Sequence, residues 1–418
     1  MRRLLTDRQA DVLELAGRLG DRFAERAGEH DRENTFPSEN WPAMAEAGYL
    51  ALTVPAELGG FDANPSEFLL AQERLAQGDG ATALAVDMHL TTCASFGSLW
   101  RRHRDERAEG LLRGAASGEV VFASCTSEAG YGGALEDCAT IATPTDGGFL
   151  LNGRKIFFTE SDVATHFTTC ARVEHPDAGP HMVFFNGIPI DTPGLAVVRT
   201  WDTLGMRATQ SNDLQLEDAF VPDEALFHAY PVGRLDATIG LTVMSLNVPS
   251  FGAIALGIAT AGMENVQRSV IDRGRTADPE VQHAFAQMEV LLETARAVLY
   301  RHAHELDTFD RPAHLSVTDV YARGNLAKYV ACQNAIAIMD HVMEIAGGVG
   351  YHRRFPIERL YRDVRAGAIM PYSSPDARKL FAASALGIEQ SPVQDYADSA
   401  TGLERFVEAL RSPATRAR

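Results

Sequence analysis

The segment LGMRATQSNDLQLEDAFVP (204–222) separates two parts of the chain with different sequence patterns. Before it, from Glu119, short β-branched or aromatic runs such as VVFASCTSE, GFLLNGRKIFFT and HMVFFNGI alternate with Gly, Pro and Asp. These runs predict a β domain of roughly a hundred residues that ends near Phe220–Pro222. After it, from Thr238 to about Gly387, apolar residues return at helical spacing.

The N-terminal part is also predicted to be helical, from Thr6 to about Ser117, because apolar residues recur every three or four positions, as in Val12–Phe23. The resulting order is helix bundle, β barrel or sandwich, helix bundle, in the α+β class. We place an N-terminal all-α domain at 1–118, a middle β domain at 119–230 and a C-terminal helical bundle at 231–390. A tail at 391–418 carries one short amphipathic piece around Leu403–Leu410.

Composition excludes several functional classes. With 38 Lys and Arg against 56 Asp and Glu, the formal net charge of −18 argues against a nucleic-acid or anionic-membrane partner. Charges near the N-terminus interrupt any export signal, and Leu241–Met263 is expected to be a buried helix rather than a membrane span, so we expect a cytoplasmic protein. The five cysteines form no CxxC pair, and we expect ordinary buried thiols, without a disulfide framework or metal site.

Two turn motifs lie in the β domain. ASCTSEAGYGG (123–133) brings hydroxyls and exposed backbone N–H groups together with little side-chain bulk, which suits hydrogen bonds to carbonyl and phosphate oxygens of a ligand. A plain turn would explain the same string. Asn152–Gly153 predicts a type I′ hairpin between two apolar strands.

Four segments together resemble the acyl-CoA dehydrogenase superfamily, in the family's order and over nearly the whole chain. They are FPSENWPAMAEAGYLALTVPAELGG (36–60), ASCTSEAGYGG (123–133), GFLLNGRKIFFTESDVATHF (148–167) and the segment 204–222. The resemblance implies an N-terminal helical domain, a middle β-barrel or sandwich domain, a C-terminal four-helix bundle and bound FAD.

The same resemblance assigns residues to the flavin. Thr126 and Ser127 would face the isoalloxazine, and Gly132 and Gly133 would approach the phosphates. In the family's counterpart of the segment 148–167, an aromatic shields the flavin ring and a hydroxyl bonds its N5. The resemblance gives these roles to Phe157 and Thr159, although Phe157 equally suits a core position. Ser373 stands where the family has a flavin-contacting Thr.

Two C-terminal segments are similar to the family's contacts with the rest of FAD. In AGGVGYHRRFPIERLYRDVRAG (346–367), Gly347 and Gly348 would approach the adenosine diphosphate of a neighbouring subunit's FAD. The family glutamine is replaced there by Glu344. In DRGRTADPEVQ (272–282), Arg273 or Arg275, and Gln282, would contact the diphosphate. FAD shared between subunits implies a homo-oligomer, a dimer or tetramer.

The family's catalytic base is missing. Dehydrogenation of an acyl thioester needs a carboxylate to take the α-proton while hydride passes to the flavin. Most of the family carries a glutamate eight residues beyond the Asp of the pair Arg362–Asp363, and this chain has Pro371 there. A smaller group carries it at the start of the long C-terminal helix, where this chain has about Asn247.

Three explanations remain open. The base has moved, with His89 first and Asp376 and Glu344 behind it, and the enzyme dehydrogenates a small-molecule or carrier-bound acyl thioester and needs an electron acceptor. Alternatively, the chain is a two-component flavin-dependent monooxygenase fed by a flavin reductase, and His89, Tyr372, Ser373 and Ser374 line its pocket. All of these residues also suit structural positions, His89 as a core histidine. The third explanation is a non-catalytic relative that keeps the fold.

Overall fold

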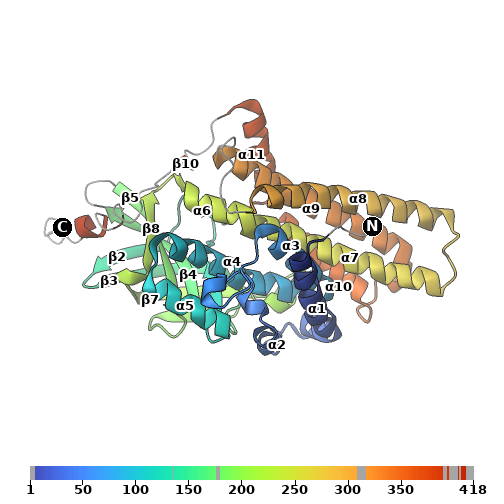
Figure 1. The fold of residues 1–418 in the computed structure, drawn as a ribbon, viewed down its shortest axis with the longest axis horizontal. Coiled ribbons are helices and arrows are strands. Elements are labelled where there is room, and N and C mark those ends of the chain that lie inside the picture. Colours follow the sequence, from blue (N-terminus) through green and yellow to red (C-terminus); the bar gives the residue numbers. More distant parts are fainter. Residues whose placement is uncertain are drawn as a thin grey trace.

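The computed structural model describes residues 5–133, 135–175, 179–307, 317–388, 393–394, 403 and 406–410. The chain forms a helical domain, then a sheet domain, then a second helical domain, which confirms the predicted α+β organisation. Figure 1 shows the sheet at one end of the molecule and the long C-terminal helices extending away from it, with the N-terminal helices alongside both.

The N-terminal domain forms where apolar spacing and capping residues coincide. Thr6 caps the first helix by accepting the Gln9 N–H, and the Gln9 side chain accepts the Thr6 N–H in return. Asn64 caps the third helix in the same way, with Pro65 in its first turn. The helices are α1 (Asp7–Glu33), α2 (Asn40–Glu46), α3 (Pro65–Gly78), α4 (Gly80–His103) and α5 (Glu106–Ser117).

The middle domain is one eight-stranded sheet with strand order β6-β7-β3-β2-β4-β5-β8, and β1 pairs with β4 in parallel. Its inner face buries an apolar core that includes Phe149, Phe167 and Phe185. The strands are β1 (Phe122–Cys125), β2 (Ile141–Thr145), β3 (Gly148–Phe158), β4 (His166–His175), β5 (Gly179–Pro189), β6 (Leu195–Val198), β7 (Asn212–Pro222) and β8 (Leu226–Pro231).

The hairpin predicted at Asn152–Gly153 is wrong. β3 continues through both residues with a register shift against β7, and the β2–β3 turn lies earlier, at Asp146–Gly147, where Gly147 has φ +78°. Gly153 is required for another reason, because a Cβ there would lie 2.3 Å from the Oγ1 of Thr140. The glycine thus permits a close approach between two segments rather than a turn.

The C-terminal domain is built on long helices. The segment Gly240–Asp272 is long and apolar enough to cross a membrane, but 78% of its most apolar window is buried inside the protein, as expected for a core helix. The elements are α6 (Ala237–Thr242), a π-helical turn (Val243–Asn247), α7 (Val248–Asp272), α8 (Pro279–Glu305), α9 (Val317–Ala346), α10 (Pro356–Asp363) and α11 (Ser374–Leu386), with β9 (Leu235–Asp236) and β10 (Val393–Gln394) as a small parallel pair.

Part of the C-terminal tail returns to the middle domain. Phe406 and Leu410 are buried in the apolar core of the sheet, 9% and 4% exposed. All five cysteines are free and buried. The amphipathic piece predicted around Leu403–Leu410 therefore contributes its described apolar residues to the β domain.

We predict that Gly153→Ala destabilises the protein by about 1–3 kcal/mol, because the added methyl overlaps Thr140 in a packed sheet. Gly110→Ala is the matched control, since Gly110 lies inside α5 with no atom near its Cβ position, and it should stabilise by about 0.5–1 kcal/mol. Urea unfolding measures both changes, and equal stability of the two variants would contradict the close-approach role.

Candidate functional site

A cavity of about 900 Å³ lies where the three domains meet. Its walls come from α4, from the turn after β1, from the end of β3, from the loop 201–206 and from the segment around Pro371. This volume is in the range of pockets that enclose a small molecule or cofactor. The predicted flavin residues that line it are Thr126, Ser127, Gly132, Gly133, Phe157, Thr159 and Ser373.

A buried ion pair between Glu128 and Lys155 of β3 fixes the turn that carries Thr126 and Ser127 against the sheet. Lys155 of β3 and Glu128 are 0% and 3% exposed, and Nζ lies 2.6 Å from Oε1. Glu128 also accepts hydrogen bonds from the backbone N–H groups of Ala139 and Thr140. Because both charges are paired and hydrogen-bonded, the turn has one defined position against the sheet. Neither residue was identified from the sequence.

The opposite wall touches this turn at a glycine. A Cβ on Gly133 would lie 2.5 Å from the Cγ of Pro371, so only glycine allows the two segments to meet. Pro371 and Asn247, the residues at the family's two base positions, both line the cavity. Neither side chain can accept a proton at useful pH.

Phe157 is exposed to the cavity rather than buried in the core. It is 50% exposed, has φ +60°, and its ring meets the edge of Trp201 with centroids 6.0 Å apart and planes at 89°. Trp201 also lines the cavity and was missed in the sequence, where its position just before the segment 204–222 was the available signal. The two rings offer an aromatic face to a planar ligand.

A chain of hydroxyl groups begins at Thr159. Its Oγ1 lies 2.7 Å from the Oγ of Ser211, which lies 2.8 Å from the Oγ1 of Thr209, and Thr209 donates to the carbonyl of Met206 at 2.9 Å. A carbonyl can only accept, so the three bonds form together only if Ser211 donates to Thr209 and Thr159 donates to Ser211. The Thr159 oxygen then faces the cavity as an acceptor.

His89 has a structural position instead of the catalytic one predicted for it. It is 0% exposed, does not line the cavity, and both ring nitrogens bond backbone groups: Nε2 with the Leu50 carbonyl at 2.9 Å and Nδ1 with the Phe122 N–H at 3.0 Å. Burial lowers the pKa of His89 to about 4, so the ring is neutral. We therefore do not retain His89 as the base.

Of the other predicted catalytic residues, Tyr372 lines the cavity and Ser374 does not. Burial raises the pKa of the Tyr372 phenol. Ser374 accepts from the Gln333 amide at 3.1 Å. Ser373 bonds Asp376 at 2.5 Å, and this bond, with Lys379, lowers the pKa of the Asp376 carboxyl. Asp376 and Glu136 are the described carboxylates that line the cavity, and Glu136 was not identified from the sequence.

The residues predicted for the adenosine half of FAD lie elsewhere. They sit where α7 ends, α8 begins and α9 ends, at the end of the C-terminal helices away from the sheet (Figure 1). Gly347 and Gly348 have open space at their Cβ positions, and Gly347 has φ +59°. These residues do not line the cavity within one chain: Arg273, Arg275, Gln282, Glu344, Gly347 and Gly348. Their predicted contact with a neighbouring subunit's FAD stays a prediction.

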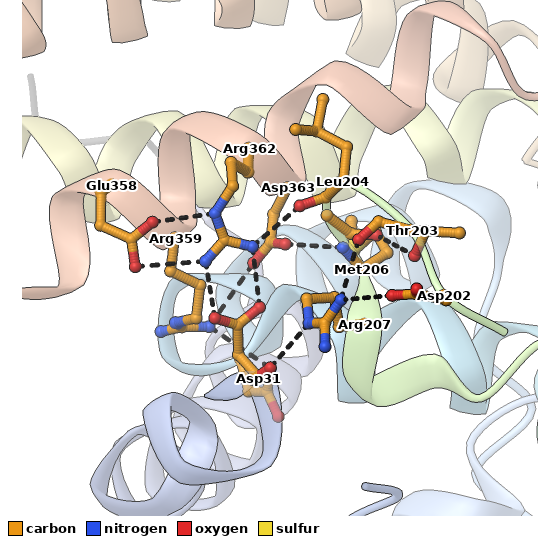
Figure 2. Close-up of polar contacts among 12 residues, drawn as sticks. Asp31, Asp202, Thr203, Leu204, Met206, Arg207, Glu358, Arg359, Arg362 and Asp363 are labelled. Carbon is orange, nitrogen blue, oxygen red and sulfur yellow. Dashed lines mark hydrogen bonds and ion pairs between the residues drawn. The ribbon is translucent and has the colours of Figure 1, made fainter. Parts of the chain in front are cut away.

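A polar junction holds the three domains together beside the cavity (Figure 2). Arg362 of α10 forms two bonds with the Asp31 carboxylate of α1, at 2.9 and 2.6 Å, and donates to the Leu204 carbonyl at 2.9 Å. Glu358 pairs with the same guanidinium at 2.8 Å. Arg362 and Leu204 both line the cavity, so this junction is also part of its wall.

A second set of bonds fixes the same loop from Asp363. The Met206 N–H donates to the Asp363 carboxylate at 2.6 Å, and Arg207 donates to the Asp31 carbonyl at 2.9 Å. A Cβ on Gly205 would lie 2.5 Å from the Arg362 carbonyl oxygen, so the loop can pass this close only as glycine. The loop 204–207 is thus held against α1 and α10 at once (Figure 2).

Three family models match successive parts of the chain. They are the acyl-CoA dehydrogenase N-terminal domain at residues 6–119, the middle domain at 123–219 and the C-terminal domain at 242–371. The putative acyl-CoA dehydrogenase YdbM of Bacillus subtilis is 32% identical, over 87% of this chain and 94% of that protein. L-evernosamine nitrososynthase of a Micromonospora species is also 32% identical, over 99% of this chain and 96% of the relative.

Solved structures give the same picture. KijD3 in complex with FMN and dTDP-3-amino-2,3,6-trideoxy-4-keto-3-methyl-D-glucose is 29% identical, with a TM-score of 0.85, over 93% of this chain and 96% of that chain. Butyryl-CoA dehydrogenase of Megasphaera elsdenii, at 23% identity, shares the fold, with a TM-score of 0.80 over 92% of this chain and 100% of that one.

We predict that Arg362→Met lowers the free energy of unfolding by about 3 kcal/mol, because it leaves the buried Asp31 carboxylate and the partly buried Glu358 carboxylate without their cation. The control is Arg365→Met, whose partner Asp340 is half exposed and whose loss should cost under ~1 kcal/mol. Chemical denaturation compares the two. A small effect for Arg362→Met would show that the junction is not needed to hold the domains.

Proposed function

This chain belongs to the acyl-CoA dehydrogenase family, and within that family we propose that it is a flavin-dependent monooxygenase supplied with reduced flavin by a separate reductase. The family supports a flavin oxidoreductase, and the finer assignment rests on the cavity described above. Its substrate is a small molecule that enters this cavity beside the flavin.

The absence of a suitable base at the family positions carries this proposal. Pro371 and Asn247 line the cavity where family members place a glutamate, and the first substitute, His89, is locked in the core. Asp376 is held ionised by Ser373 and Lys379, and a carboxyl with a lowered pKa is a weak proton acceptor. A dehydrogenase needs that proton removed, whereas oxygen transfer from reduced flavin does not.

The cavity fits a flavin in its chemistry as well as in its size. Thr126 and Ser127 stand on a fixed turn, Gly132 and Gly133 leave the backbone accessible, and Phe157 offers an exposed ring face. When bound in reduced form, flavin supplies the electrons that activate dioxygen. The chain's residues hold and orient it and exclude water from the apolar parts of the cavity.

The hydroxyl chain favours reduced flavin. Because the Thr159 proton is committed to Ser211, the Thr159 oxygen can only accept from a ligand. A reduced flavin ring carries an additional N–H donor that the oxidised ring lacks. Thr159 therefore supports a protein that takes up reduced flavin, as a monooxygenase fed by a reductase must.

Two relatives also support the monooxygenase proposal. The L-evernosamine nitrososynthase relative spans nearly the whole chain, and KijD3, which was solved with FMN, matches over 93% of it. We retain FAD as the predicted cofactor only with the contribution of Gly347 and Gly348 from a neighbouring subunit. FMN lacks the adenosine half and would need only the cavity of one chain as its binding site. Heat release of the flavin followed by chromatography separates the two.

A second candidate is dehydrogenation of an acyl thioester with a relocated base. One observation favours it: Glu136 is a carboxylate that lines the cavity. Its Oε2 accepts the Leu135 N–H at 3.0 Å, which holds the carboxylate beside the turn rather than leaving it free to move.

We predict that the reduced, flavin-loaded protein reoxidises in air in two kinetic phases, the second slower than the oxidation of free reduced flavin. Rapid-mixing absorbance measures this, with free flavin as the control. Anaerobic titration with saturated acyl-CoA thioesters of different chain lengths should leave the flavin oxidised. Bleaching by any of them, lost in Glu136→Gln, would replace the monooxygenase with the dehydrogenase.

We further predict that Ser211→Ala makes the midpoint potential of the bound flavin more negative by roughly 20 mV, the equivalent of about 1 kcal/mol of hydrogen bonding. Without Ser211, the described acceptor left to the Thr159 hydroxyl is the Phe157 carbonyl at 3.4 Å, a long and weak hydrogen bond, so the proton can turn to the cavity and bond the oxidised ring. Ser211→Thr keeps the hydroxyl and should retain the wild-type potential. An unchanged or more positive potential in Ser211→Ala would count against the polarised chain.

A further inference from the structure

Five neutral hydrogen-bonding side chains from α4 and from the sheet line the cavity, and we call this part of its wall the recess. We propose that it binds an uncharged amide or hydroxyl group at the non-reacting end of the substrate. This assignment rests on the proposed function only in placing the substrate's other end beside the flavin. The recess is formed by Thr92 and Ser95 from α4 and by Ser124, Thr168 and Asn186 from three adjacent strands.

The sheet side of the recess follows from strand register. Ser124 of β1 is the direct parallel partner of Thr168 of β4, so their side chains lie next to each other on one face. Their neighbours Ala123 and Phe167 point into the apolar core on the other face. Asn186 lies on β5, which pairs with β4 on its other side. Thr168 and Asn186 both fall in the register shift of this pair, between Phe167–Ile188 and Thr169–Phe185, so polar side chains of β1, β4 and β5 come together at this irregularity.

Two of these residues carry side-chain polar groups that have no hydrogen-bond partner among the described residues. The Oγ1 of Thr168 has no hydrogen-bond partner among the described residues. Asn186 is 3% exposed, and Arg107 bonds its backbone carbonyl at 2.9 Å, while its side-chain amide bonds no other described residue. Buried polar groups are seldom left unpaired, because each costs free energy unless something bonds it. A ligand in the recess would provide that bond.

The helix side brings further hydroxyls to the same place. Phe96 of α4 stacks on Phe122 of β1, with ring centroids 5.0 Å apart, and this contact sets the helix on the sheet. Ser95 precedes Phe96, and Ser124 lies two residues beyond Phe122 on the same face. The recess thus has hydrogen-bonding groups on both sides.

The chemistry of these groups defines the ligand. All five side chains are neutral, and they include hydroxyls and an amide that can both donate and accept. A phosphate, carboxylate or ammonium group would lose its hydration here without meeting an opposite charge from the recess. An alkyl chain would leave Thr168 and Asn186 unpaired. An amide or hydroxyl group carries no charge and can form hydrogen bonds with Thr168 and Asn186.

The test uses four probes of equal chain length: hexanamide, 1-hexanol, hexanoate and hexylammonium. Ligand-observed NMR titration of the oxidised, flavin-loaded protein measures their dissociation constants without reductant or turnover. We expect hexanamide and 1-hexanol to bind more tightly than the two ions. Asn186→Leu and Thr168→Val should each weaken hexanamide by about tenfold, the effect of losing one buried hydrogen bond.

Thr143→Val is the matched control, because Thr143 lies exposed on β2 outside the cavity, and it should leave all four affinities unchanged. Thermal melting confirms that each variant is folded. Equal or tighter binding of either ion, wild-type affinity for hexanamide in both recess variants, or no binding of any probe would overturn the proposal. Because no oxygen chemistry is measured, these outcomes are independent of whether the protein is a monooxygenase.

Discussion

The pairing of Arg362 with Asp31 brings all three domains to one point in the wall of the cavity. The guanidinium bonds a carboxylate of the first domain and the Leu204 carbonyl of the middle domain, while its own helix belongs to the third. A buried ion pair alone adds little stability, since desolvation offsets the attraction. Its planar, bidentate geometry instead fixes position. The apolar clusters shared between the helical domains, and between the sheet and the C-terminal helices, set the separation of the walls together with this junction.

Close approaches at glycines complete the same arrangement. Gly205 passes under the Arg362 backbone, and Gly133 meets Pro371 across the cavity. Each contact brings together two segments far apart in sequence, and each leaves no room for a side chain. The cavity is therefore bounded by backbone at these two points, which defines its shape more rigidly than flexible side chains could.

The chemistry of the cavity depends on neutral groups in fixed orientations. Thr159, Ser211 and Thr209 form one chain of hydroxyls whose direction is set by a carbonyl at its end. Outside the cavity, the neutral His89 uses both ring nitrogens to join α4, β1 and the Leu50 backbone, so it takes no part in the reaction. A site of this kind binds and orients the substrate and the cofactor, and the cofactor supplies the reactive chemistry. This is the physical basis for preferring oxygen transfer over α-proton removal.

Local pattern was sufficient for the helices, the sheet domain and their order, because apolar periodicity and capping residues act within a few positions. The family resemblance, carried by two short motifs, predicted Thr126, Ser127, Phe157 and Thr159 as flavin contacts, and all four line the cavity. Local pattern misassigned Asn152–Gly153 and His89, since a turn dipeptide and a histidine among apolar residues read alike whether they face solvent, a ligand or the core. Only contacts between distant segments distinguish these cases: Gly153 against Thr140, and His89 between Leu50 and Phe122. Trp201, Glu136 and the junction at Arg362 were decided in the same way, by packing that joins residues with no local signal in common.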